Sequence, residues 1–185
     1  STAESSSSSS TSSSTSTTSS TQNESATTHS QTSSQQPTVV INEILPHPAD
    51  GESEWIELYA SASGVNLTGW TIEDGAGVIA TLDQTMSTSF AIVELASSKL
   101  NNPGDTLTLK NASGVTVDRM TYGSWDDGNK DDNAPSVSQG VSLGRFPDGR
   151  DTGSDATDWF ATKSPTKNSV NSIATAETPA PVTEV

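Results

Sequence analysis

The chain has 185 residues, no cysteine and a formal net charge of −15. The missing cysteines exclude disulfides, Cys-ligated zinc and a thiol nucleophile. All eight Lys and Arg residues and nineteen Asp and Glu residues fall within residues 38–170, which gives that segment a net charge of −11. Such a surface repels phosphate backbones and anionic headgroups, so we expect no nucleic-acid partner. No apolar run reaches the length of a membrane span, so we also expect no membrane insertion.

Composition divides the chain into three parts. Residues 1–37 form a Ser/Thr-rich tract, and its first 36 residues contain no aromatic or branched aliphatic side chain. Such a segment buries nothing that offsets the entropy of ordering, so it is predicted to be a disordered linker or stalk. Residues 171–185 are rich in Thr, Pro and Glu and are predicted to be a disordered tail. Residues 38–170 have the size of one folded domain. Because the chain begins with Ser rather than Met, we expect it to be a mature or excised segment of something longer.

Within this domain, short runs of alternating apolar and polar residues predict an all-β fold. Leu107 and Leu109, for example, alternate with Thr and Lys, as in a strand with one buried face. Residues 111–114 (NASG) between two such runs predict a tight hairpin. The predicted strands are Val39–Leu45, Trp55–Tyr59, Trp70–Glu73, Val78–Leu82, Phe90–Leu95, Thr106–Lys110, Val115–Tyr122, Val141–Arg145 and Trp159–Thr162.

About nine short strands in about 130 residues indicate a Greek-key β-sandwich with an immunoglobulin-like arrangement. A closed barrel is the alternative. The uneven lengths of strands and loops favour the sandwich, because up-and-down barrels are more regular.

Several motifs together resemble the lamin-tail domain family. They run in order from INEILPHP, EWIELY and NLTGW to FAIVEL, GDTLTLKNASGVTVDRMTYG, SLGRFPDG and DWF…SPTKN, and they cover residues 39–168. The loop WDDGN…DNAP is similar to the microbial, exported branch of the family. The resemblance implies an immunoglobulin-like sandwich that serves as a noncatalytic module of secreted or surface proteins, often beside hydrolases or nucleases. It implies no catalytic residues.

The strongest candidate for a chemical site is the acidic loop SWDDGNKDDN at residues 124–133. Calcium prefers six to eight oxygen ligands and tolerates irregular loops. A second acidic stretch could fold against the first; its members are Asp148, Asp151, Asp155 and Asp158. The alternative is a pair of solvated loops with Asx-turns. The predicted calcium ligands are Asp126, Asp127, Asp131, Asp132 and Asn133.

The tryptophans raise a second possibility, a stacking platform for sugar rings. Trp55, Trp70 and Trp159 lie on predicted strands, where a tryptophan usually packs in the core. Trp125 alone lies in a polar loop, so it is the candidate carbohydrate-binding residue.

Three glutamates and the one histidine of the domain are the residues whose chemistry could serve acid–base or nucleophilic catalysis. Glu54 and Glu57 are expected to be solvated, because alternation places Glu57 opposite Ile56 and Leu58. Glu43 shares a predicted face with Ile41 and Leu45, so we expect it to be half-buried and hydrogen-bonded to backbone. His47 lies between two prolines without a nucleophile motif and is predicted to be a surface residue of a turn.

Two further features concern structure and modification. Arg145 alternates with Val141 and Leu143, so we expect it to pair with an acidic neighbour. Asn23, Asn66 and Asn111 open N-x-S/T sequons, which carry glycans only in a host with that chemistry.

The sequence therefore predicts a noncatalytic extracellular or cell-surface interaction module on a flexible stalk, with a protein or glycan partner. One alternative is an accessory domain, binding calcium or carbohydrate, of a larger secreted hydrolase or nuclease. Another is a lamin-like scaffold, which the acidic charge disfavours.

Overall fold

The computed structural model describes residues 38–96 and 98–172. The two tails predicted to be disordered lie, apart from Asn171 and Ser172, outside the described residues.

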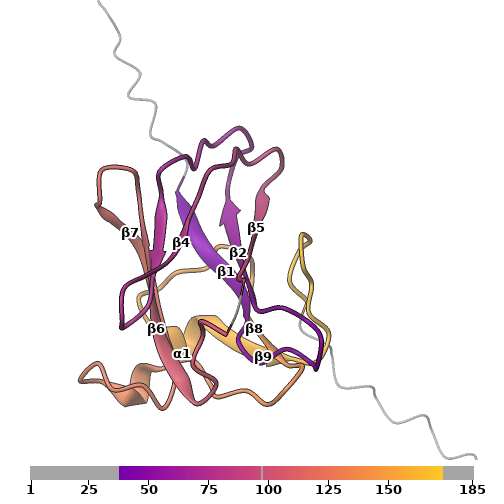
Figure 1. Ribbon diagram of the computed structural model, residues 1–185. Helices are drawn as coiled ribbons and strands as arrows, with labels where there is room; N and C mark the ends of the chain where they lie inside the picture. Colours follow the sequence, from indigo (N-terminus) through magenta and orange to yellow (C-terminus); the bar gives the residue numbers. More distant parts are fainter. Residues whose placement is uncertain (1–37, 97, 173–185) are drawn as a thin grey trace, which may run out of the picture. The chain divides into compact units, whose positions relative to one another are not determined.

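Two antiparallel sheets make up the described part of the chain (Figure 1). The five-stranded sheet has the order β5-β2-β1-β8-β9, and the four-stranded sheet has the order β4-β3-β6-β7. In the first sheet the strands are β1 (Val39–Leu45), β2 (Trp55–Ala60), β5 (Phe90–Glu94), β8 (Ser142–Arg145) and β9 (Trp159–Thr162). In the second they are β3 (Thr71–Glu73), β4 (Val78–Thr81), β6 (Gly104–Lys110) and β7 (Thr116–Gly123).

The chain passes from one sheet to the other after β2, β4, β5 and β7. This connectivity is that of a sandwich and not of an up-and-down barrel, so the predicted fold class is confirmed. All nine predicted strands are present, with ends that shift by at most two residues. The predicted hairpin is also present, since the amide of Gly114 donates to the carbonyl of Asn111.

The core lies between the sheets and contains apolar side chains from both. Ile41, Ile44, Ile56 and Leu58 of the first sheet face the second sheet and are fully buried. The second sheet contributes Ile72, Leu107, Leu109 and Met120, which are also fully buried. This burial removes the apolar face of every long strand from water and is the main stabilising contribution to the fold.

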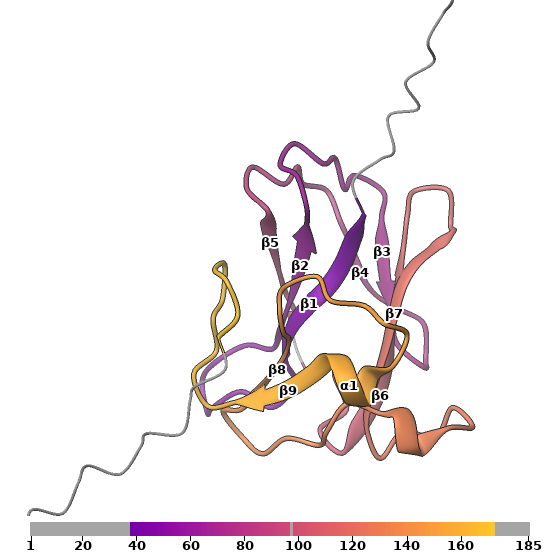
Figure 2. The ribbon, with the colours of Figure 1, turned by 180° about the vertical axis from the view of Figure 1, so that it is seen from behind.

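Two short helical turns were not predicted. The 3-10 turn η1 (Lys130–Asp132) lies in the acidic loop, and α1 (Asp155–Asp158) leads into β9. In the view from behind, α1 lies near β7 and β9, which it contacts (Figure 2). Neither has an apolar repeat of several turns, which explains why periodicity did not find them. No helix among residues 38–96 and 98–172 is long and apolar enough to cross a bilayer.

A β-bulge in β1 changes which way its side chains point. Ile41 pairs with Leu58 and Glu43 pairs with Glu57, so Asn42 is an extra residue without a partner on β2. Both Ile41 and Ile44 therefore face the core, although strict alternation would separate them. The prediction that Glu43 shares a face with Ile41 is thus wrong: the bulge turns Glu43 to the outer face of the sheet, beside Glu57.

The segment after β9 (yellow in Figure 1) covers this outer face. Thr166 and Asn168 donate backbone N–H groups to Glu43 and Glu57, respectively. Asn171, predicted to belong to the tail, is buried, and its Nδ2 donates to the carbonyls of Asn42 and Arg145. The packed domain therefore extends beyond residue 170 and includes Asn171.

A glycine at the end of β7 is required by a close backbone approach. Gly123 has φ +64°, and a Cβ on it would lie 2.2 Å from the carbonyl oxygen of Pro103. We expect Gly123→Ala to lower the free energy of unfolding by roughly 2–4 kcal/mol, since both the left-handed backbone and the contact oppose a side chain. Gly114→Ala is the matched control: its φ is +76° with nothing within 4 Å, and we expect a cost of about 1–2 kcal/mol. Equal costs in urea denaturation would contradict the role of the close contact.

Candidate functional site

The outer face of the five-stranded sheet carries two buried glutamates side by side. Glu43 and Glu57 are fully buried and form a cross-strand pair. Glu43 accepts hydrogen bonds from the hydroxyls of Ser142 (2.6 Å) and Thr166 (2.9 Å). Glu57 accepts from Asn42 Nδ2 (3.0 Å) and from the amide of Asn168. The prediction of a solvated Glu57 is wrong, because the segment after β9 excludes water from this face.

Burial controls the ionisation of this pair. It raises the pKa of Glu57 to about 7, although the hydrogen bonds from Asn42 and Asn168 act in the opposite direction. Burial also raises the pKa of Glu43. All the oxygens of both carboxylates are engaged by the protein's own donors, so this pair holds the covering segment in place and faces no substrate groove.

Arg145 links the two sheets. Its side chain is fully buried, and its Nη2 lies 3.1 Å from Asp118 Oδ1 on β7. Nε donates to the carbonyl of Ile41 (2.8 Å), and Nη1 donates to the carbonyl of Arg150. The guanidinium also lies 4.9 Å from the centre of the Trp159 ring. The predicted acidic partner of Arg145 is therefore confirmed, and the pair is structural.

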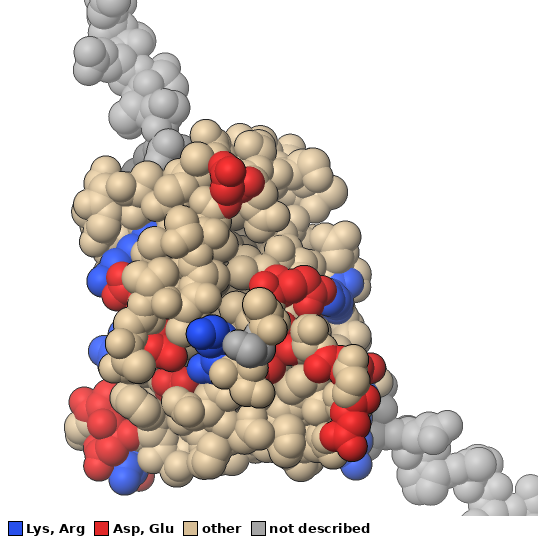
Figure 3. All heavy atoms as spheres, in the orientation of Figure 1, with Lys and Arg blue, Asp and Glu red and all other residues tan. Residues whose placement is uncertain are grey.

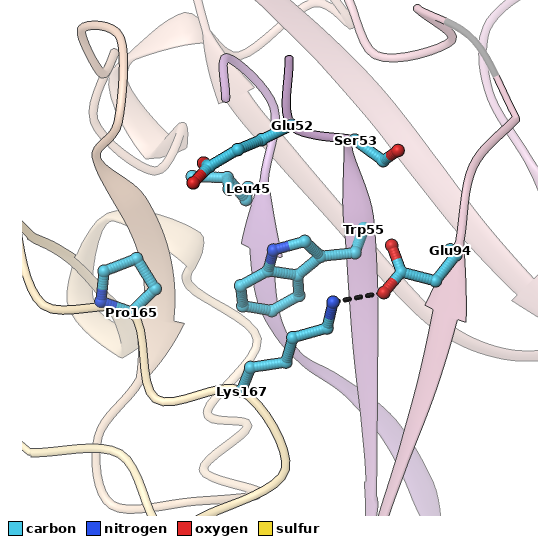
Figure 4. Close-up of a pocket in the computed structure, with 7 residues that line it drawn as sticks. All are labelled: Leu45, Glu52, Ser53, Trp55, Glu94, Pro165 and Lys167. Carbon is cyan, nitrogen blue, oxygen red and sulfur yellow. Dashed lines mark hydrogen bonds and ion pairs between the residues drawn. The ribbon is translucent and has the colours of Figure 1, made fainter. Parts of the chain in front are cut away.

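An open hollow lies beside the Glu43–Glu57 pair. It is found where the covering segment, residues 163–171 after β9, crosses the outer face of the sheet. Its volume is about 570 Å³, and Figure 4 shows the Trp55 ring at its centre. The lining residues are Leu45, Glu52, Ser53, Trp55, Glu94, Pro165 and Lys167. Leu45 and Trp55 form a cross-strand pair on the outer face, separate from the core between the sheets. We call this feature the Trp55 hollow.

Lys167 is the charged side chain that reaches over the ring. Its Nζ lies 5.5 Å from the centre of the Trp55 ring and pairs with the carboxylate of Glu94. None of the residues of the hollow was predicted as a site residue, and Trp55 was expected to pack in the core. A signal was present, because Leu45 and Trp55 are large apolar residues next to the core positions Ile44 and Ile56.

The acidic loop does not gather its carboxylates. Asp126 pairs with Lys130, and Asp127 pairs with Arg119. Asp132 accepts a hydrogen bond from Ser154 (2.5 Å), so the second acidic stretch does fold against the first. Asn133 uses its Nδ2 to bind the carbonyls of Gly123 and Trp125. Among residues 38–96 and 98–172, no three acidic or histidine side chains are placed to hold a metal ion.

Calcium binding at this loop stays a prediction. If Asp126 and Asp131 bind calcium, millimolar Ca²⁺ should raise the melting temperature, because a ligand of the folded state stabilises it. The double variant D126N/D131N should then lose the increase. Melting curves with calcium and with EDTA that superimpose would contradict the prediction.

Trp125 is half-buried and packs on another loop. A Cβ added to Gly75 would lie 2.3 Å from Cη2 of Trp125, so the ring rests on the backbone between β3 and β4. Trp55, Trp70 and Trp159 are all buried. The condition for a stacking platform, several exposed tryptophans together, is therefore not met among the described residues. A carbohydrate role of Trp125 stays a prediction.

The remaining candidates from the sequence are Glu54, His47 and the three sequons. Glu54 is buried, contrary to expectation, because it accepts the backbone amides of Lys99 (2.6 Å) and Leu100 (3.0 Å). His47 lies in a turn, half-buried, and its carbonyl accepts the amide of Gly140. The sequons of Asn66 and Asn111 line one common hollow of about 630 Å³ with Trp70. The third sequon, at Asn23, lies outside the described residues.

Two antiparallel sheets around one core define an immunoglobulin-like β-sandwich. The model of the lamin tail domain family matches residues 32–124, about half of the chain. The chain belongs to the lamin tail domain family. No curated protein and no solved structure matched the chain. The immunoglobulin-like architecture of this family is compatible with a noncatalytic interaction module.

Proposed function

We propose that this domain is a noncatalytic interaction module of an extracellular or cell-surface protein, carried on the Ser/Thr-rich segment at residues 1–37. The observation that carries the proposal is the contrast between the two features of the outer face. The buried carboxylates Glu43 and Glu57 are saturated by internal hydrogen bonds, whereas the neighbouring Trp55 hollow is open. A saturated carboxylate pair is unsuited to acid–base catalysis, whereas an open hollow floored by the buried Trp55 ring and edged by charged side chains suits recognition.

The location outside the cell is supported by composition. A long Ser/Thr tract is typical of stalks that hold a domain away from a surface. The test is an antibody against the domain, applied to intact cells before and after mild protease treatment. Signal on intact cells that protease removes is expected, and signal only after lysis would contradict the location.

The interaction function is tested with the full chain immobilised and a panel of surface proteins and glycans of the source organism as probes. We expect saturable binding to at least one probe, without turnover of polysaccharide, ester or nucleic-acid substrates. Ser53→Trp, an exposed position in the Trp55 hollow, should weaken that binding at least about tenfold because the indole fills the hollow.

Ser113→Trp is the matched control, since Ser113 is also exposed but lines the hollow of the two sequons. It should leave binding unchanged. Turnover of any substrate, or no saturable binding to the whole panel, would overturn the proposed function.

A further inference from the structure

The chain places its own cation in the Trp55 hollow. The ammonium of Lys167 lies 5.5 Å from the centre of the Trp55 ring, within the range of a cation–π contact. It also forms an ion pair with the carboxylate of Glu94 (Figure 4). The hollow thus joins an aromatic face and the carboxylate of Glu94 around one positive charge. This combination is the one with which proteins recognise ammonium and guanidinium groups.

The internal cation is held weakly enough to be displaced. The side chains of Lys167 and Glu94 are 40% and 54% exposed, respectively. An exposed ion pair contributes little stability, in general below about 1 kcal/mol. Lys167 also lines a neighbouring hollow of about 450 Å³ with Phe90 and Ile92 on β5. The lysine therefore has open space beside it into which it can move without unfolding the sheet.

Charge favours an external cation at this place. Glu52 and Glu94 both line the Trp55 hollow, and the segment of residues 38–170 has a net charge of −11. Figure 3 shows acidic side chains distributed over the visible face among fewer basic ones. A negative field of this kind increases the local concentration and the association rate of positively charged partners.

Resting on the proposed interaction function, we propose that the Trp55 hollow binds an Arg or Lys side chain from a basic segment of a partner protein. Lys167 occupies the hollow in the free chain and leaves when the partner cation enters. The Trp55 ring then provides the cation–π contact, and Glu94, released by Lys167, accepts hydrogen bonds from the incoming group. Glu52 adds negative charge at the rim.

The test uses the full chain and a capped peptide, Gly-Gly-Arg-Gly-Gly, with a second peptide in which neutral citrulline replaces Arg. Binding is followed by the NMR signal of the Trp55 indole N–H. We expect the Arg peptide to shift this signal and the citrulline peptide to leave it unchanged. Lys167→Gln should tighten binding about fivefold, because removal of a competitor worth about 1 kcal/mol gives that factor. Glu94→Gln should weaken binding.

Lys163→Gln controls for net charge, since Lys163 is exposed and does not line the hollow. Asp131→Asn is the corresponding control for Glu94→Gln. Lys167→Ala, which also removes the charge, should reproduce the effect of Lys167→Gln. Equal affinity of the Lys167 and Lys163 variants, or equal shifts by the two peptides, would overturn the inference.

The two proposals fail separately. If Ser53→Trp abolishes capture of a panel member while no Arg peptide shifts the Trp55 signal, the cation inference falls and the interaction function stands. If the panel shows no binding and the peptides cause no shift, both fall.

Discussion

Arg145→Met should lower the free energy of unfolding by about 3–5 kcal/mol, the largest effect expected of any single substitution here. The fully buried guanidinium neutralises Asp118, whose side chain is only 3% exposed. It also binds the backbone carbonyls of Ile41 and Arg150. Without it, the buried carboxylate of Asp118 keeps only neutral hydrogen-bond donors such as the amide of Ile41 and loses its charged partner. The buried carbonyl of Ile41 and the part-buried carbonyl of Arg150 each lose a donor, which is costly where water does not replace it.

Arg119→Met is the matched control, because Arg119 also pairs with an aspartate, Asp127, but its side chain is 51% exposed. We expect a cost below about 1 kcal/mol in the same urea titration. The double variant R145M/D118N should be less destabilised than the sum of its two single variants, since it leaves no unpaired buried charge. A cost of R145M no greater than that of R119M would show that Arg145 does not join the two sheets energetically.

The second large effect is a loss of stability with rising pH. Glu57 has an ordinary pKa near 4.5, and burial raises its pKa to about 7 in the folded domain. Between these values only the folded state holds the proton, so deprotonation favours unfolding as the pH rises. Stability from this group is complete below pH 4.5 and lost above pH 7, with a total change of roughly 3 kcal/mol. Glu43, whose pKa burial also raises, acts in the same direction.

Glu57→Gln isolates this contribution. The variant cannot ionise at position 57, so its unfolding free energy should fall less steeply between about pH 5 and pH 8. Its absolute stability is expected to be lower, because the NH2 group of the amide opposes one of the two donors, Asn42 or Asn168, while the amide oxygen can accept from only the other. The slope with pH is therefore the measurement, taken from urea titrations at several pH values. Identical slopes for the wild-type protein and the variant would refute the conclusion that burial raises the pKa of Glu57.

The covering segment connects these predictions with the proposed site. Thr166 and Asn168 bind the glutamate pair, and Lys167 between them reaches over Trp55. The same short stretch thus closes the polar network on one side and shapes the hollow on the other. Substitutions at Glu43 or Glu57 should therefore be avoided in binding experiments, because they alter the position of Lys167.

The sequence by itself determined the fold class and the strands of this protein. Alternation such as that of Leu107 and Leu109 is a local property of a strand with one buried face, and turn residues such as Asn111 and Gly114 act within a few residues. The acidic partner of Arg145 was also predictable in kind, since a charge among core positions requires compensation. The family of the chain was recognisable as well, because its motifs are local stretches of sequence that follow one another in a fixed order.

Only the tertiary structure decided what lies on the outer face of the five-stranded sheet. One extra residue at Asn42 reverses the direction of Glu43, and alternation cannot register such a bulge. The covering segment buries Glu57 and places Lys167 over Trp55, although it lies more than a hundred residues after both Glu57 and Trp55 in the chain. Contacts between distant segments are set by the packing of the whole domain. For this reason the apolar residues Leu45 and Trp55 signal an apolar outer face, but local sequence does not show that Lys167 lies over it.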